Sequence, residues 1–108
     1  KNQYHVAHTT DQLDGEFTLF RDAKNNRHYL AFRDTEGGIR ESKLQGEEWA
    51  MTKPSELASA PQAKGDPIGW AEANTGARHY LYQSENGDVH QLSFDGKWTH
   101  QSLSPKVE

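Results

Sequence analysis

The chain has 108 residues, of which 32% are hydrophobic, so we expect one small thin-cored domain or part of one. Its net charge is −4, with acidic and basic residues intermixed, which argues against nucleic acid as a partner, and no apolar run approaches the roughly 20 residues of a membrane span. The lack of cysteine excludes disulfides and thiolate chemistry, whereas three Trp, four Tyr and four Phe argue against a disordered chain.

The first predicted element is a strand at Tyr4–Thr10, within the segment 1–14. Its sequence, YHVAHTT, resembles WTHQSLS at Trp98–Ser104, with Tyr4 in the place of Trp98. We interpret it as the last strand of a repeat unit whose first three strands do not precede it in the chain.

The segment 15–64 is predicted to contain four strands and a connector. Turn-forming residues separate the strands at Asp22–Asn26, Thr35–Gly38 and Gln45–Glu48. The connector, Lys53–Ala63, holds two prolines, so it is predicted to be extended, with room for one helical turn.

The segment 65–108 repeats this organisation. Asn86-Gly87 and Asp95-Gly96 supply the positive φ angles of tight hairpins. The four strands predicted between such turns are Pro67–Ala73, Arg78–Ser84, Asp88–Phe94 and Lys97–Leu103.

The two segments also match residue by residue. His-Tyr-Leu occurs at 28–30 and again at 79–81, a spacing of 51 residues. Other matches lie 49 or 50 residues apart: Gly15 and Gly65, Phe20 and Trp70, Ile39 and Val89, Glu41 and Gln91, Gly46 and Gly96, and Trp49 and Trp98. A four-strand unit repeated at about 50 residues is typical of β-propeller blades.

We therefore predict an all-β fold: two four-stranded β-propeller blades plus one extra N-terminal strand. The blades are 15–64, with its connector, and 65–108; 1–14 would be the outer strand of an adjoining blade. A sandwich of eight or nine strands fits the turn spacing nearly as well, but it gives no reason for residue identity at a period of 50.

Two blades cannot close a ring, because propellers need four to eight. One solution is self-assembly, in which three copies complete six blades or four copies complete eight. The other is that the chain is a fragment of a longer propeller. The N-terminal strand fits both: it would pair with the open sheet edge of another chain, or it would be what is left of a divided blade.

Both segments share one motif. It begins with His-Tyr-Leu and an acidic turn that contains Gly, continues with a β-branched residue two positions before Glu or Gln, and ends with Gly and Trp. This motif resembles the repeat of the fucose-binding β-propeller lectins of bacteria and fungi. The resemblance covers Gly15 to Ser104. It implies a non-enzymatic, carbohydrate-binding lectin that is secreted or on the cell surface, binds glycans or glycoconjugates and needs no cofactor. Some bacterial members are two-blade chains that trimerise, so the resemblance also implies a homo-oligomer.

The resemblance assigns sugar-binding roles to six residues: His28, Glu41, Trp49, His79, Gln91 and Trp98. The family's acceptor carboxylate falls on Glu41 and on Gln91, and its stacking Trp falls on Trp49 and Trp98. Its donor Arg is replaced by His, with Arg27 and Arg78 adjacent. Neutral His cannot reproduce a guanidinium fork, so the pattern supports a sugar site without specifying the sugar.

Each assigned residue also has a structural interpretation. The two Trp follow hairpin turns and would pack between blades, and the two His would hold the sheets together through buried hydrogen bonds. Glu41 would be a solvated strand carboxylate, and Trp70, which matches Phe20, would be blade packing. If these interpretations hold, the chain is a propeller module for protein interaction without a sugar site.

The six histidines do not follow metal-ligand spacing. His5 and His8, three residues apart on one predicted strand, point to opposite faces. No group of residues suggests a nucleophile with its base, so we expect neither a metal site nor an enzyme.

Overall fold

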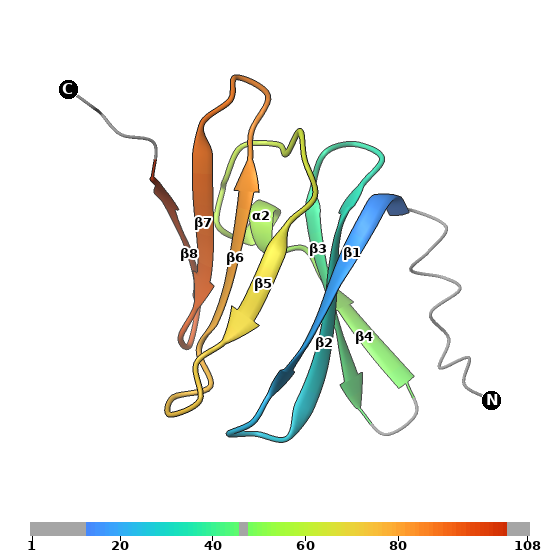
Figure 1. Cartoon of the computed structure of the whole chain (residues 1–108), viewed down its shortest axis with the longest axis vertical. Coiled ribbons are helices and arrows are strands. Elements are labelled where there is room, and N and C mark those ends of the chain that lie inside the picture. Colours follow the sequence, from blue (N-terminus) through green and yellow to red (C-terminus); the bar gives the residue numbers. More distant parts are fainter. Residues whose placement is uncertain (1–12, 46–47, 104–108) are drawn as a thin grey trace.

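The computed structural model describes the backbone of residues 13–45 and 48–103, and the side chains within 17–44 and 50–103. The described chain contains eight strands and one single-turn helix (Figure 1). The elements are β1 (Leu13–Asp22), β2 (Arg27–Asp34), β3 (Ile39–Gln45), β4 (Glu48–Thr52), α2 (Pro54–Leu57), β5 (Ile68–Ala71), β6 (Arg78–Gln83), β7 (Val89–Phe94) and β8 (Trp98–Ser102). The strand predicted at Tyr4–Thr10 lies outside the described residues.

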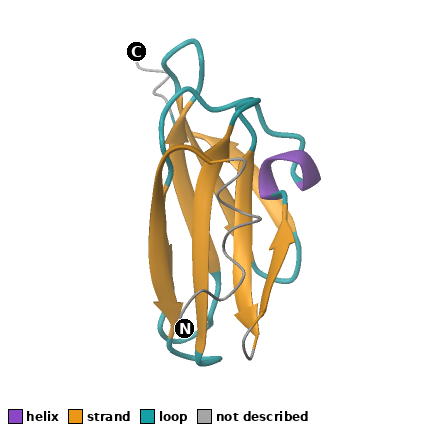
Figure 2. Ribbon diagram, turned by 90° about the vertical axis from the view of Figure 1, so that its right-hand side faces the viewer, coloured by secondary structure: helices purple, strands orange, loops and turns teal. Residues whose placement is uncertain are grey.

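The strands form two four-stranded antiparallel sheets, β1-β2-β3-β4 and β5-β6-β7-β8, so the all-β prediction is confirmed. Each sheet is an up-and-down meander. For the four strands predicted within 67–103, both ends agree with the observed strand ends to within two residues. The described sheets are open, and they do not close into a ring (Figures 1 and 2).

The turns explain why the strands end where they do. Gly37, between β2 and β3, has a φ of 89°, and Gly87, between β6 and β7, has a φ of 94°. Both values lie in the region that glycine adopts without steric cost. The turns are equivalent and 50 residues apart, as the repeat predicts.

The pairing of the strands corrects one detail of the repeat. Glu41 pairs with Ala31 in the first sheet, and Gln91 pairs with Leu81 in the second, so the structural spacing in these strands is 50. The His-Tyr-Leu match, at 51, is one residue out of phase. Because side chains on a strand alternate between faces, the matched Tyr29 and Tyr80 point to opposite faces of their sheets.

Each sheet thus has two corresponding faces, which we call front and back. The front face of the first sheet carries Thr18, Phe20, Tyr29, Ala31 and Glu41; its equivalents on the second sheet are Ile68, Trp70, His79, Leu81 and Gln91. The back faces carry the alternate residues, among them His28 on the first sheet and its equivalent Arg78 on the second.

The sheets pack front to back, with the front of the first against the back of the second. The Phe20 and Tyr80 rings meet edge to face at 5.6 Å, and the Gly69 N–H donates to Thr18 Oγ1 at 3.3 Å. A Cβ at Gly69 would lie 2.5 Å from the Tyr80 ring and 2.8 Å from Phe20. Glycine therefore permits the close approach of β5 to β1.

The core fills the space between the sheets. Its buried members are Ala31, Ile39, Ala63, Tyr80, Tyr82 and Leu92, with Phe20, Ala58, Ala60 and Trp98 packed against them. This count of aromatic side chains compensates for the low hydrophobic content, because each aromatic residue buries a large area.

The connector between the sheets closes the side of the core near β3 and β8. Its predicted helical turn is confirmed as α2, which begins at Pro54. Buried Ser55 Oγ accepts a hydrogen bond from the Ile39 N–H at 2.9 Å, and Tyr82 donates to the Pro61 carbonyl at 2.7 Å. The connector is thus bound to both sheets.

Candidate functional site

The central polar contact between the sheets joins β3 to β6. Arg78 donates to Glu41 twice, from Nε at 2.7 Å and from Nη2 at 3.0 Å. Tyr80 also donates to Glu41 Oε2 at 2.6 Å, and only 3% of the Glu41 side chain is exposed. Both Glu41 oxygens therefore already accept hydrogen bonds from residues of the protein itself.

Aromatic rings hold the Arg78 guanidinium on its faces. Its carbon lies 4.2 Å from the Tyr29 ring centroid, 4.6 Å from Phe94 and 5.5 Å from Trp98. Burial alone would lower the pKa of Arg78, but the hydrogen bonds and charge of Glu41 raise it above its ordinary value. Arg78 is therefore a fixed cation.

A recess of about 180 Å³ opens between the sheets beside this cation. It lies at the end formed by the β1–β2, β5–β6 and β7–β8 turns, and its walls are mainly polar. The lining residues are Asn25, Arg27, Tyr29, Thr75, Gly76, Ala77, Arg78, Phe94, Asp95 and Gly96.

The recess brings together the groups that a small polyhydroxylated ligand requires. A guanidinium has five N–H donors, and Glu41 takes two of those of Arg78. Among the described residues, no side chain or carbonyl accepts from the other three. Arg27 adds a second cation and Asp95 a carboxylate, and half-buried Phe94 supplies aromatic surface. Tyr29 also lines the recess, but it is only 1% exposed and its ring is packed against Arg78 and Phe20. Donors, acceptor and apolar surface therefore converge on one small space.

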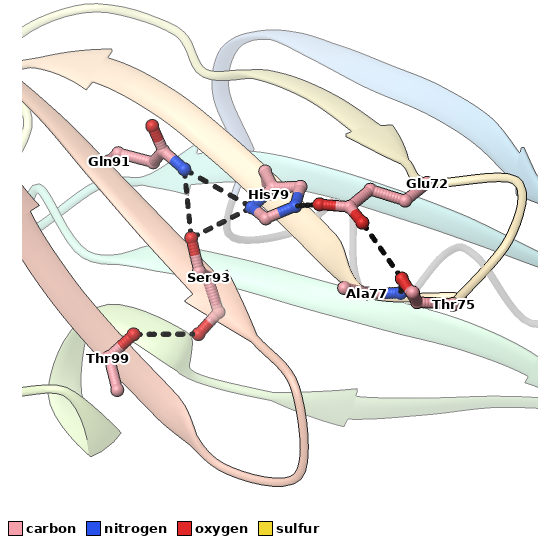
Figure 3. Close-up of polar contacts among 7 residues, drawn as sticks. All are labelled: Glu72, Thr75, Ala77, His79, Gln91, Ser93 and Thr99. Carbon is pink, nitrogen blue, oxygen red and sulfur yellow. Dashed lines mark hydrogen bonds and ion pairs between the residues drawn. The ribbon is translucent and has the colours of Figure 1, made fainter.

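A second polar cluster lies on the open front face of the second sheet (Figure 3). His79 Nε2 lies 2.7 Å from Glu72 Oε2, and His79 Nδ1 lies 2.8 Å from Ser93 Oγ and 3.2 Å from Gln91 Nε2. Thr75 donates to the other Glu72 oxygen at 2.9 Å. The sequence-predicted His79 and Gln91 are thus brought together.

The partners of His79 define its hydrogen-bonding state. The Gln91 amide nitrogen is a donor, so His79 Nδ1 accepts and Nε2 carries the proton donated to Glu72. The His79 and Thr75 hydrogen bonds lower the pKa of Glu72 below its usual value. In Figure 3 the Gln91 amide oxygen points away from this cluster.

The His79 cluster lies on the second sheet at the position where the first sheet forms one wall of the recess. His79 is the register equivalent of Tyr29, and Thr75 bonds Glu72 as Asn25 Nδ2 bonds Asp22, at 2.9 and 2.7 Å. On the first sheet this wall is covered by the second sheet, whereas on the second sheet it is open.

The other predicted site residues are separated. His28 is exposed on the back face of the first sheet, and Trp98 is half-buried, stacked on Tyr80 at 5.9 Å between ring centroids. The β4 backbone pairs Trp49 with Leu44, as β8 pairs Trp98 with Phe94, but the Trp49 side chain lies outside the described side chains. Glu41 can act on a ligand only through Arg78.

Sequence reasoning missed Arg78 as the donor and Glu72 as the partner of His79. The sequence pattern predicts His79 as the donor, whereas the donor at the recess is the preceding residue, Arg78. Because side chains alternate along a strand, neighbouring residues lie on opposite faces of the sheet. The alternation of Gln91 and Ser93 on one strand is the signal that predicts a shared face for them. Glu72 gives no such signal, because it follows β5 in the turn.

A pair of histidines lies elsewhere on the second sheet. His90 Nδ1 is 2.8 Å from His100 Nε2, and His90 Nε2 is 3.1 Å from Ser84 Oγ. Among the described residues, no three His, Cys, Asp or Glu side chains are arranged to hold a metal ion. The pair therefore reads as a packing and hydrogen-bonding unit.

Comparison with protein-family models, with curated proteins and with solved structures found no match for this chain. Within residues 13–45 and 48–103, no helix has the length and hydropathy to cross a membrane.

Proposed function

We propose that this chain is a non-enzymatic carbohydrate-binding lectin whose sugar site is the recess between two neighbouring sheets. The observation that carries the proposal is Arg78, a donor fixed by Glu41 on one side and by aromatic rings on its faces, at the wall of a small polar recess. Preorganised donors lose little conformational entropy on binding.

The chemistry of the recess fits a sugar better than an apolar ligand. Vicinal hydroxyls accept from a guanidinium and donate to a carboxylate, and the C–H face of a sugar ring packs on aromatic surface. A recess of about 180 Å³ is below the roughly 300–1,000 Å³ of drug-sized pockets, so it suits one sugar residue.

The two sheets are, in this proposal, blades of a propeller that three or four copies complete. The internal repeat and the front-to-back packing support it, because each added sheet would create another recess of the same type. Several weak sites around one ring would act together on a multivalent glycan surface.

A glycan array followed by calorimetry with the best ligand tests the function. Arg27→Ala and Asp95→Ala each remove an exposed charged group from the recess without touching the core. Each is expected to weaken binding roughly 10-fold to 150-fold, the equivalent of one hydrogen bond to a charged group. Lys64→Ala and Asp66→Ala, at exposed positions outside the recess, are the matched controls and should bind normally.

Binding to no glycan on the array would refute the lectin proposal. Glycan binding that survives both recess variants would refute the recess as its site. Circular dichroism of all four variants separates loss of binding from loss of folding.

A further inference from the structure

One row of side chains crosses the open front face of the second sheet from β5 to β8. Strand pairing aligns Trp70 with His79, His79 with Ser93, and Ser93 with Thr99. Directly opposed side chains have their Cβ atoms about 4.5–5.5 Å apart, so their polar groups are within reach of each other. An aromatic ring, an imidazole and a half-buried hydroxyl therefore lie side by side on this face.

Ser93 and Glu72 approach the two nitrogens of the same imidazole (Figure 3). Ser93 Oγ lies 2.8 Å from His79 Nδ1, and Glu72 Oε2 lies 2.7 Å from His79 Nε2. Since Nε2 carries the proton, Nδ1 holds the lone pair and accepts from the Ser93 hydroxyl. A hydroxyl bonded to a base that a carboxylate orients is the arrangement that activates a serine as a nucleophile. The sequence alone does not reveal it, because the partners of His79 lie 7 positions before it and 14 after it.

The Glu72 carboxylate is itself held by the turn between β5 and β6. Its other oxygen accepts from the Thr75 hydroxyl at 2.9 Å, and Thr75 in turn accepts from the Ala77 N–H at 3.1 Å. The hydrogen bonds from His79 and Thr75 lower the pKa of Glu72, so the carboxylate is ionised at neutral pH. Its charge stabilises the imidazolium that forms when His79 takes a proton.

We propose that Ser93 is a covalent acylation site, which takes an acyl group from an activated carboxylic ester and retains it. Ser93 Oγ attacks the carbonyl carbon of the ester, and its proton passes to His79 Nδ1. The bond between that carbon and the leaving oxygen then breaks, and His79 gives the proton to the leaving group. The products are one ester on Ser93 and one free alcohol or phenol, so no oxidant or cofactor is consumed.

The surroundings of Ser93 favour an uncharged acyl group over a phosphoryl group. The Glu72 side chain is ionised and 47% exposed, so it repels an anionic donor. Trp70 and Ile68, which are 38% and 64% exposed, lie on the same face, and the Trp70 ring is 5.2 Å from the His79 ring between centroids. These two side chains provide apolar surface on which a short acyl chain can pack.

Gln91 explains why the acyl group stays on Ser93. Gln91 Nε2 lies 3.0 Å from Ser93 Oγ and 3.2 Å from His79 Nδ1. Once Ser93 is esterified, its oxygen has no proton to donate, so the Gln91 amide becomes the donor to Nδ1. Hydrolysis needs the same nitrogen as the base for a water molecule. Because the Gln91 amide competes with that water, the ester is long-lived and the site reacts once without turnover.

A second serine beside a histidine lacks these features. Ser84 Oγ lies 3.1 Å from His90 Nε2, but the Ser84 hydroxyl donates to Asn86 Oδ1 at 2.7 Å. The other nitrogen of His90 faces His100 rather than a carboxylate, and Ser84 is only 4% exposed. Ser84 is therefore an internal control, which should not be acylated.

The acylation site is separate from the sugar recess and does not depend on the proposed function. His79 and Ser93 lie on the front face of the second sheet, whereas Arg78 lies on its back face. Ser93 also stays reachable if copies assemble as proposed. Its equivalent on the first sheet, Lys43, is half-buried although the second sheet covers that face.

Reaction of the full chain with p-nitrophenyl butyrate tests the proposal. The wild-type protein should release p-nitrophenol in a burst of about one equivalent per chain and gain one butyryl group in its intact mass. Fragmentation of the tryptic peptide His79–Lys97 should place this group on Ser93 and not on Ser84.

Two variants identify the nucleophile and its base. Ser93→Ala should lose the burst and the added mass, and His79→Gln should be acylated roughly 100-fold more slowly. Ser102→Ala and His28→Gln, at exposed positions outside this row, are the matched controls and should react like the wild type. Circular dichroism of all four variants separates loss of reactivity from loss of folding.

Glu72 acts through His79, so its test needs a readout besides loss of rate. Glu72→Ala should be acylated at least about 10-fold more slowly. Added formate should restore part of the rate, because a free carboxylate can take the vacated place, whereas a structural effect would not respond to formate. Gln91→Leu tests retention, since it should release the butyryl group faster than the wild type does.

A wild-type chain without a burst would overturn the proposal, as would butyrylation that persists in Ser93→Ala or an unchanged rate in His79→Gln. Release that continues well beyond one equivalent would show turnover in place of retention and would also overturn it. None of these results bears on the lectin proposal, because Ser93→Ala leaves the recess intact and should bind glycan as the wild type does.

Discussion

Arg78 Nε lies 2.7 Å from Glu41 Oε2, and the two residues belong to different sheets, 37 positions apart in the chain. With 12% and 3% of their side chains exposed, this ion pair is largely removed from water. Tyr80 completes it, and the pKa of Tyr80 is raised well above its usual value by burial and by the Glu41 charge. Arg78 therefore has two roles: it lines the recess, and its buried ion pair with Glu41 holds the two sheets together.

Replacing Arg78 with Met should destabilise the protein by about 3–5 kcal/mol, because it leaves the Glu41 carboxylate buried without its cation. Urea denaturation followed by fluorescence measures the change. Arg27→Met, which removes an exposed cation at the start of β2, beside the same recess, should change the unfolding free energy by less than about 0.5 kcal/mol. The double variant Glu41→Leu with Arg78→Met should recover much of the loss, and equal losses in the single and double variants would contradict the burial argument.

Gly69→Ala should destabilise the protein by about 1–3 kcal/mol through overpacking. The added methyl group would lie 2.5 Å from the Tyr80 ring, so β5 must move away from β1 or the rings must shift. Gly65 is the control, since a Cβ there meets nothing within 4 Å. Its replacement by Ala should be neutral or add about 0.4–1 kcal/mol by restricting the unfolded chain. Similar midpoints for the two variants would exclude the close approach.

The strands and turns of this fold follow from local sequence. Asn86-Gly87 and the glycines at 37 and 38 set the hairpins, and alternating residues set the strands, so the repeat of four strands could be predicted within a residue or two. How two such sheets face each other depends on contacts between residues far apart in the chain. The pairing of Arg78 with Glu41 has no local signature.

The candidate site was predictable only in part, for a geometric reason. Letter matching placed His28 and His79 at the same position, whereas strand pairing makes His28 the counterpart of Arg78 and His79 that of Tyr29. Side-chain direction along a strand repeats every two residues. An alignment error of one residue therefore assigns to the recess a side chain that lies on the opposite face of the sheet. His79 and Gln91 do lie together in the structure, because their shared face within the second sheet is unaffected by the error.

Ser55→Ala should destabilise the protein by about 1–3 kcal/mol. The buried Ser55 hydroxyl accepts from the Ile39 N–H at 2.9 Å, and without it this amide loses the partner at the start of β3. Ser102→Ala, at an exposed position at the end of β8, is the matched control and should have little effect. Hydrogen exchange of the Ile39 amide provides the direct readout, since it should become faster in the Ser55 variant alone. Unchanged exchange would show that the hydroxyl does not hold the connector to the sheet.

The His90–His100 pair should make stability depend on pH below neutrality. Burial, and then the nearby charge of His90, lower the pKa of His100 below its ordinary value. The unfolded chain, in which His titrates near about 6.5, therefore binds protons that the folded chain rejects. The free energy of unfolding should be highest above that pH, fall as the pH drops through it, and level off once the folded protein also binds the proton.

Urea unfolding at intervals between about pH 8 and 5 measures this slope, above the range in which carboxylates titrate. His100→Gln removes the titrating group, so its unfolding free energy should vary less over the same interval. His28→Gln, at an exposed position, is the matched control and should keep the wild-type slope. Two nitrogens 2.8 Å apart have room for only one proton between them, so the two facing nitrogens cannot both be protonated without breaking this hydrogen bond. A His100→Gln profile as steep as that of the wild type would assign the pH dependence to another group.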